Sequence, residues 1–303
     1  MKTRENKGTI FLAIAGVSFL FSFTNIAAKE AVMNFSPWAV AFFRFMIGSV
    51  TLYLLMKLMR KRINLQPVDK WRFVTLAFLA VPLNQITFLT GIQYTPASHP
   101  ALLYATTPAW VLLLAVWLRV EKLRWWKWAG IILAMLGVAI LFIGEFVSFR
   151  QETIRGDLFL IIALFSWALY TTLGKPIVER YGALETTFVV ITFGFFLYIP
   201  FGLWPVITAD YSQITLKVVF SIIYIGVFAS GIAYFLWYWL LERIRPSQVA
   251  IITCLGPPLT AFFEWTIFGT VPTINLLLSS IVVLAGIALM VGYGGTKQSI
   301  RND

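Results

Sequence analysis

Three ionisable side chains lie inside long apolar segments of the chain, namely Arg44, His99 and Glu264. A charged group in apolar surroundings is costly unless it is paired, so each should face a partner or a cavity. The planar guanidinium of Arg44 could hold the carboxylate of a bound molecule, pair with a structural partner such as Glu264, or reach toward a membrane interface. Glu264 could carry a proton or contact a substrate ammonium group. It could equally form a structural ion pair or be a buried, neutral acid.

His99 is the only histidine, and it lies between Ser98 and Pro100 at the start of an apolar segment. An imidazole titrates near neutral pH and could relay a proton. We favour the simpler interpretation that it caps the following helix. Since no second histidine, cysteine or carboxylate lies near it in the sequence, we expect no metal site there. No cofactor is predicted.

Neutral polar and aromatic side chains occur in the same apolar segments. Amides and hydroxyls such as those of Asn84 and Gln85 could hydrogen-bond between helices or contact a substrate. Aromatic rings with polar edges suit the walls around an amphipathic or aromatic solute, although many such rings form belts at membrane interfaces. The predicted binding residues are Thr24, Asn25, Arg44, Asn84, Gln85, His99, Tyr104, Trp167, Tyr170, Tyr234, Tyr238 and Glu264.

Prolines recur at matching places in the two halves of the chain. Pro96 and Pro246 each open an apolar segment, and Pro108 and Pro258 interrupt those segments twelve residues later. A proline inside a helix costs about 3 kcal/mol, and a membrane tolerates it where protein or water satisfies the freed carbonyl. Such a doubled break predicts a binding cavity, and simple packing kinks are the alternative. The predicted hinges are Pro82, Pro108, Pro257 and Pro258.

The composition is that of a membrane protein. Of the 303 residues, 59% are hydrophobic and 12% are charged, whereas about a quarter of the residues in soluble proteins are charged. The net charge of +11 resides in short loops beside apolar segments, as the positive-inside rule expects, so we predict no nucleic-acid partner. The single cysteine, Cys254, allows no internal disulfide.

Ten segments are long enough to cross a membrane. These are residues 8–28, 37–58, 71–94, 98–118, 125–143, 156–175, 183–205, 218–241, 246–268 and 273–293. The chain therefore predicts an all-α polytopic membrane protein with five-helix repeats at 8–143 and 156–293, a linker at 144–155 and a cytoplasmic tail at 294–303. Most Lys and Arg residues lie in the loops on one side, so both termini are predicted to be cytoplasmic in a cell membrane.

The two halves also resemble each other in sequence. Gly8-Thr-Ile-Phe-Leu matches Gly156-Asp-Leu-Phe-Leu, and Leu136-Gly-Val-Ala-Ile matches Ala285-Gly-Ile-Ala-Leu. Because each predicted repeat contains an odd number of spans, the second should lie inverted relative to the first. Inverted repeats that meet at a midplane site are typical of secondary transporters.

Several short motifs recur in the order of a known family. They are Arg44-Phe45, Pro108, the Val-Glu-Lys-Leu sequence at 120–123, Trp128-Ala-Gly and Leu136-Gly-Val, then Pro258, Gly269 and Gly286. Through them the chain resembles the EamA-type family of the drug/metabolite transporter superfamily. Thr270 stands where the family often has an acidic residue. The resemblance implies a carrier of small molecules in a lipid bilayer, often an exporter of amino acids or other metabolites, including aromatic amino acid exporters of the YddG type.

Enzyme signatures such as a Gly-x-Ser-x-Gly elbow or a P-loop lysine motif are missing from the sequence, so we predict no enzymatic activity. A membrane sensor or scaffold that transports nothing, and a membrane-embedded enzyme, stay as alternatives. The protein is predicted to be a monomer or a weak homo-oligomer.

Overall fold

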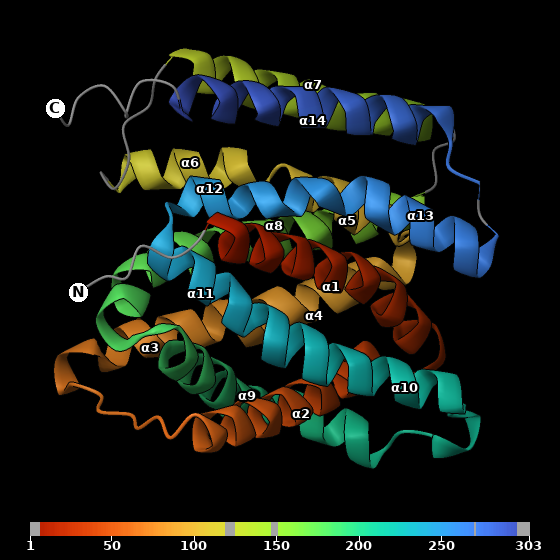
Figure 1. Ribbon diagram of the computed structural model, residues 1–303. Coiled ribbons are helices and arrows are strands. Elements are labelled where there is room, and N and C mark those ends of the chain that lie inside the picture. The colour runs from red at the N-terminus through yellow and green to blue at the C-terminus, as the bar shows by residue number, and fades with distance from the viewer. Residues whose placement is uncertain (1–6, 119–124, 147–150, 270, 296–303) are drawn as a thin grey trace, which may run out of the picture.

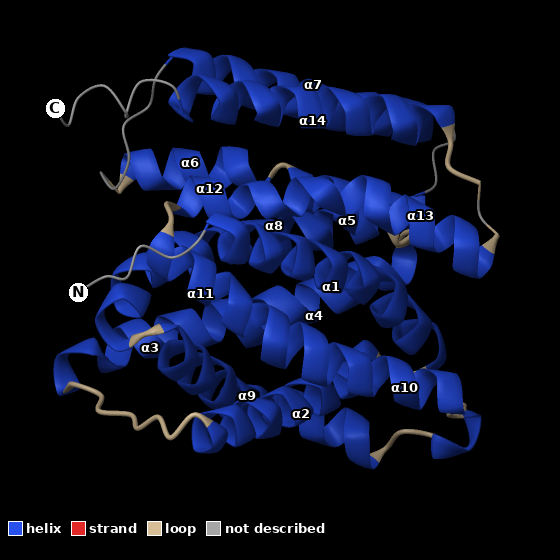
Figure 2. Cartoon of the chain, viewed as in Figure 1, coloured by secondary structure: helices blue, strands red, loops and turns tan. Residues whose placement is uncertain are grey.

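The computed structural model describes residues 7–118, 125–146, 151–269 and 271–295. Within these ranges every regular element is a helix (Figure 2). The all-α prediction is therefore confirmed. The predicted motif at 120–123, Thr270, residues 147–150 of the predicted linker and residues 296–303 of the predicted tail lie outside the described residues.

In the described residues, fourteen α-helices follow one another, with short 3₁₀ and π segments between some of them. The α-helices are α1 (Lys7–Asn34), α2 (Pro37–Leu58), α3 (Lys70–Phe78), α4 (Asn84–Tyr94), α5 (Ser98–Ala105), α6 (Thr107–Trp117), α7 (Trp125–Phe146), α8 (Gln151–Tyr181), α9 (Ala183–Ile207), α10 (Leu216–Tyr224), α11 (Tyr234–Arg243), α12 (Pro246–Ala250), α13 (Gly256–Phe268) and α14 (Ile274–Gly295). The other segments are η1 (Pro67–Asp69), η2 (Leu79–Leu83), η3 (Tyr211–Gln213), η4 (Ile225–Ala233) and η5 (Ile251–Leu255).

Eight helical stretches of the described chain are long and apolar enough to cross a membrane. They coincide with eight of the predicted spans, and α7 and α14 occupy the places of the fifth and tenth. The total of ten stays a prediction. Several helices are longer than predicted, since an apolar segment marks only the part in hydrocarbon and polar residues can extend a helix beyond it. The predicted linker is the clearest case, because its first residues belong to α7 and its last residues to α8.

α7 and α14 pack side by side along their length, at the top of Figure 1. Their backbones come close where Gly137 meets Val283, since a Cβ on Gly137 would lie 2.6 Å from Val283 Cγ2. The remaining helices form the body of the molecule, in which α2 packs on α9 and on η4, and α4 packs on α8.

Four of the membrane-length stretches are not continuous α-helices. η2 and η4 are π-helical, and η5 is 3₁₀. The remaining break lies at Thr106, between α5 and α6. Pro108 lies in the first turn of α6, as Pro257 does in the first turn of α13, where a missing N–H costs no helical bond. The prediction that the prolines interrupt their segments is confirmed.

Small residues of η4 let it approach α2 closely. A Cβ on Gly226 would lie 2.7 Å from the Ile47 side chain, and a Cβ on Gly48 of α2 would lie 2.9 Å from Ser230 Cβ. This close packing fixes the segment of α2 that carries Arg44 against Ser230 of η4.

Candidate functional site

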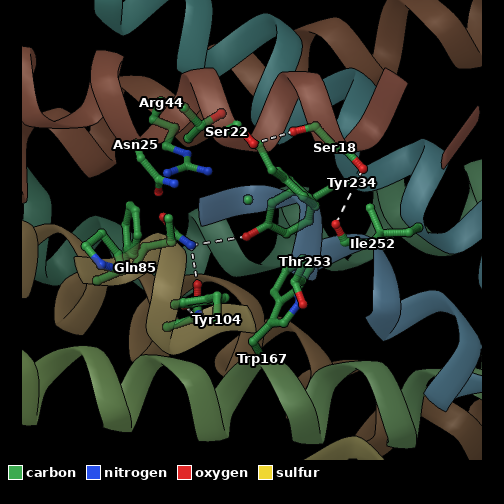
Figure 3. A pocket seen from close by; sticks show the side chains of 17 residues that line it. Ser18, Ser22, Asn25, Arg44, Gln85, Tyr104, Trp167, Tyr234, Ile252 and Thr253 are labelled. Carbon is green, nitrogen blue, oxygen red and sulfur yellow. Dashed lines mark hydrogen bonds between the residues drawn. The ribbon is translucent and has the colours of Figure 1, made fainter. Parts of the chain in front are cut away.

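A cavity of about 80 Å³ lies where the broken helices meet α1, α2 and α8. By the space that one water requires, roughly 10 to 15 Å³, it has room for roughly five to eight water molecules. Both halves of the chain contribute to its wall (Figure 3). The lining residues are Ser18, Phe21, Ser22, Thr24, Asn25, Arg44, Asn84, Gln85, Phe88, Pro100, Ala101, Tyr104, Trp167, Tyr234, Ile252, Thr253 and Gly256.

Arg44 is the one charged side chain among the lining residues described. It is 2% exposed, and its Nε donates a hydrogen bond of 2.7 Å to Ser230 Oγ. Its Nη1 is buried and has no hydrogen-bond partner. A buried donor without an acceptor costs the full desolvation of that group. The cavity therefore has one positive group with a free donor.

Two amides and two phenols form a hydrogen-bonded group beside Arg44. Asn84 Nδ2 donates to Tyr104 Oη at 3.1 Å and to the carbonyl of Ala163 at 2.6 Å, and Gln85 Nε2 donates to Tyr234 Oη at 3.1 Å. Gln85 also donates to Asn84 Oδ1. Because these bonds fix both amides, Gln85 Oε1 is left buried without a donor. The cavity wall thus also offers one free acceptor.

Aromatic rings form much of the apolar wall. The Trp167 ring lies 5.1 Å from that of Tyr234 and 5.8 Å from that of Phe21, both in edge-to-face geometry. Its Nε1 is buried and has no partner, although a buried indole N–H usually finds one. Trp167 therefore adds a second free donor to a mainly apolar surface.

The α1 face of the cavity is polar at helical spacing. Ser18, Ser22 and Asn25 follow one another at intervals of three or four residues and line the cavity together. Asn25 Nδ2 donates to Thr260 Oγ1 of α13 at 3.2 Å. Thr24 donates to the carbonyl of Leu20 one turn earlier. The spacing of this stripe was visible in the sequence, and our prediction took only its end, Thr24 and Asn25.

The structure places most of the predicted binding residues together and separates four from the cavity. Those that line it are Thr24, Asn25, Arg44, Asn84, Gln85, Tyr104, Trp167 and Tyr234. The others are His99, Tyr170, Tyr238 and Glu264. Tyr170 and Tyr238 stack on each other with ring centroids 4.7 Å apart, and both are fully buried. The Tyr170 ring also lies 5.2 Å from that of Trp167, so the stacked pair packs against a residue of the cavity wall.

His99 lies in a buried pair with a carboxylate from a distant part of the chain. Its Nδ1 is 3.0 Å from Asp157 Oδ1, and both side chains are buried. We had expected no carboxylate nearby because Asp157 is 58 positions away along the chain. The pair joins the start of α5 to α8. No group of three or more His, Cys, Asp or Glu that could hold a metal ion occurs in the described part of the chain.

Glu264 interacts electrostatically with Lys29. The Lys29 Nζ donates to the carbonyls of Ile92, Gln93 and Thr95 at 2.9, 3.1 and 2.7 Å. We had considered Glu264 as a structural partner of Arg44, whereas the hydrogen-bond partner of Arg44 in the structure is Ser230.

The fold and this cavity define a polytopic helical membrane protein with a small cavity lined from both of its halves. The model of the EamA-like transporter family matches residues 8–143 and 154–292. The chain belongs to that family.

Curated relatives share its length. An uncharacterized transporter of Archaeoglobus fulgidus is 27% identical over 94% of this chain and 97% of its own length. The uncharacterized transporter YoaV of Bacillus subtilis is 22% identical over 92% of this chain and 95% of its own. A crystal structure that is 16% identical superposes with a TM-score of 0.73 over 96% of this chain and 100% of its own, which shows the same fold. The family prediction is confirmed, and specificity of the YddG type stays a prediction.

Proposed function

We propose that this protein is a secondary transporter that moves a small amphipathic metabolite, such as an amino acid or a related carboxylate, out of the cytoplasm. The solute would bind in the cavity between the two repeats, and rocking of one repeat against the other would expose it to each side in turn. The observation that carries the proposal is the cavity itself. It is lined from both repeats at the breaks in their helices, and three of its buried polar atoms have no partner.

The helix breaks support the moving part of the proposal. Non-helical backbone at membrane depth is tolerated where it lines a cavity, and π segments often occur at functional sites. We propose Pro82, Pro108, Pro257 and Pro258 as hinges, because each lies at or beside such a break. The inverted arrangement of the repeats, both termini in the cytoplasm and a monomeric or weakly associated state belong to the same proposal.

Reconstitution in liposomes tests the proposal. Purified protein with a confirmed fold should move at least one member of a broad panel of labelled amino acids, carboxylates, amines and neutral metabolites faster than empty liposomes do. If no member of the panel were transported, the proposal would be contradicted. A sensor or scaffold that transports nothing is the alternative, and the polar atoms left free in the cavity count against it, because a scaffold gains nothing from leaving them unpaired.

A further inference from the structure

The charge balance of the cavity narrows the class of solute. Arg44 carries a positive charge, and only 2% of the residue is exposed. Its Nε is hydrogen-bonded to the hydroxyl of Ser230, which is neutral. No Asp or Glu lies among the lining residues described. The titratable groups that act on Arg44 most strongly are Tyr104 and Tyr234, whose phenols are ordinarily uncharged at neutral pH. The wall of the cavity therefore has a net positive charge.

A carboxylate fits this arrangement. A guanidinium presents a planar fork that binds the two oxygens of a carboxylate, and such charge-assisted bonds are the strong ones. One arm of the Arg44 fork has its Nη1 buried and free. Trp167, whose buried indole N–H also has no partner, lines the same cavity. An acidic group is the ligand that satisfies a free donor on a fixed positive charge.

An ammonium group does not fit it. A cation in the cavity would be repelled by Arg44, and the described lining has no carboxylate to offset that repulsion. Gln85 Oε1 is a free acceptor, but a neutral carbonyl oxygen matches a hydroxyl or an N–H as well as it matches an ammonium. The rest of the wall is apolar and aromatic, formed in part by Phe21, Phe88 and Trp167.

We propose that the solute is a monocarboxylate with a compact apolar or aromatic body and without an ammonium group, held through its carboxylate by Arg44. This inference rests on the proposed transport function and goes further, because it excludes zwitterionic amino acids and amines as preferred solutes. The site thus discriminates by charge at one end of the solute and by shape at the other.

Four small molecules with one phenyl ring and different ends test the assignment on the unaltered protein. These are 3-phenylpropionate, its amide 3-phenylpropionamide, phenethylamine and phenylalanine. We expect 3-phenylpropionate to raise the thermal unfolding temperature of the detergent-purified protein in a saturable way, since a ligand that binds only the folded state stabilises it. Its Kd should be at least roughly thirty-fold lower than that of the isosteric amide, because loss of a buried charge pair has an effect of that order.

Variants of Arg44 test whether this residue causes the preference for the carboxylate over the amide. Arg44→Gln should weaken 3-phenylpropionate roughly thirty-fold or more and leave binding of the amide nearly unchanged. Arg44→Lys keeps the charge and loses the fork, so it should recover part of the affinity. Lys217→Gln is the control, because it removes a positive charge from an exposed side chain outside the cavity. If Arg44→Gln does not fold, the comparison of the four molecules on the unaltered protein decides alone.

The outcomes separate this inference from the proposed function. Equal binding of the carboxylate and the amide, equal or better binding of phenylalanine or phenethylamine, or no binding of 3-phenylpropionate would overturn the substrate class. If the liposome panel nevertheless showed flux of an amine or a neutral solute, the protein would still be a transporter. If no member of that panel were transported, the proposed transport function itself would be contradicted.

Discussion

Lys29 and Lys175 lie at equivalent places in the two repeats, and each binds the carbonyls at the end of another helix of its own repeat. Lys29 of α1 donates to Ile92, Gln93 and Thr95 at the end of α4, and Lys175 of α8 donates to Leu241, Glu242 and Ile244 at the end of α11. A positive charge at a helix C-terminus is favourable. The chain then enters the broken stretches that begin with α5 and α12, so each lysine holds the start of a cavity-lining segment.

Removing either lysine charge should destabilise the protein. Lys29→Met and Lys175→Met each leave several carbonyls without a charged donor, and hydrogen bonds to charged groups contribute about 1.5 to 3 kcal/mol. We expect each variant to unfold at a lower temperature in detergent. Lys217→Met, at an exposed lysine with one surface ion pair, should change the unfolding temperature little. Wild-type stability of both the Lys29 and the Lys175 variant would show that the carbonyls find other donors.

Glu264 should act through Lys29 and not through the solute. Glu264→Gln removes the charge that acts on Lys29 and should lower stability in the same direction as Lys29→Met. Because Glu264 is not among the cavity-lining residues, the variant should keep any dependence of flux on a pH gradient that the wild type has. If the variant folded as the wild type does but lost that pH dependence, Glu264 would be identified as a proton-carrying group instead.

The His99–Asp157 pair should couple α5 to α8. His99→Gln and Asp157→Asn each disrupt a buried contact of 3.0 Å, and residues in such contact show coupling of about 0.5 to 3 kcal/mol in a double-mutant cycle. We expect the double variant to lose less stability than the two single variants added together. Simple additivity would mean that the two side chains are near each other without interacting.

A close backbone contact between α4 and α8 should not tolerate a methyl group. A Cβ on Gly91 would lie 2.8 Å from the carbonyl oxygen of Gly156 and 2.7 Å from Leu160 Cγ, and overpacking of this kind costs about 1 to 3 kcal/mol. Gly91→Ala should therefore lower the unfolding temperature. Gly16→Ala is the matched control, because a Cβ there meets nothing within 4 Å, and alanine favours a helix by up to about 1 kcal/mol over glycine. Equal behaviour of the two variants would show that the helices can separate at no cost.

Cysteine labelling in intact cells tests the proposed orientation. Ser212→Cys lies in the loop after α9 and should react with a reagent that cannot cross the membrane. Ile63→Cys, in the loop after α2, should react only once the membrane is made permeable. The native Cys254 is buried and gives little background. The reverse pattern would place both termini outside.

The sequence predicted the spans well because membrane length and hydropathy fix them directly. It also predicted the breaks at Pro108 and Pro258, since proline acts locally. The π segment η4 was missed because Gly226, Ser230 and Gly231 carry no such local signal, and that segment supplies the partner of Arg44. His99 was predicted as a binding residue because an imidazole titrates near neutral pH. Its contact with Asp157 of the other repeat was not predicted, because contacts between repeats depend on packing that no local pattern specifies.

The single positive charge on the wall of the cavity also bears on what could drive transport. A monocarboxylate bound there would cross the membrane as a net negative charge, and 100 mV of membrane potential is worth about 2.3 kcal/mol for each elementary charge. With the cell interior negative, that energy favours exit by roughly fifty-fold in concentration at equilibrium. Such a carrier could export its solute by the electrical gradient alone, without a coupling ion, whereas uptake of the same solute would have to work against the voltage.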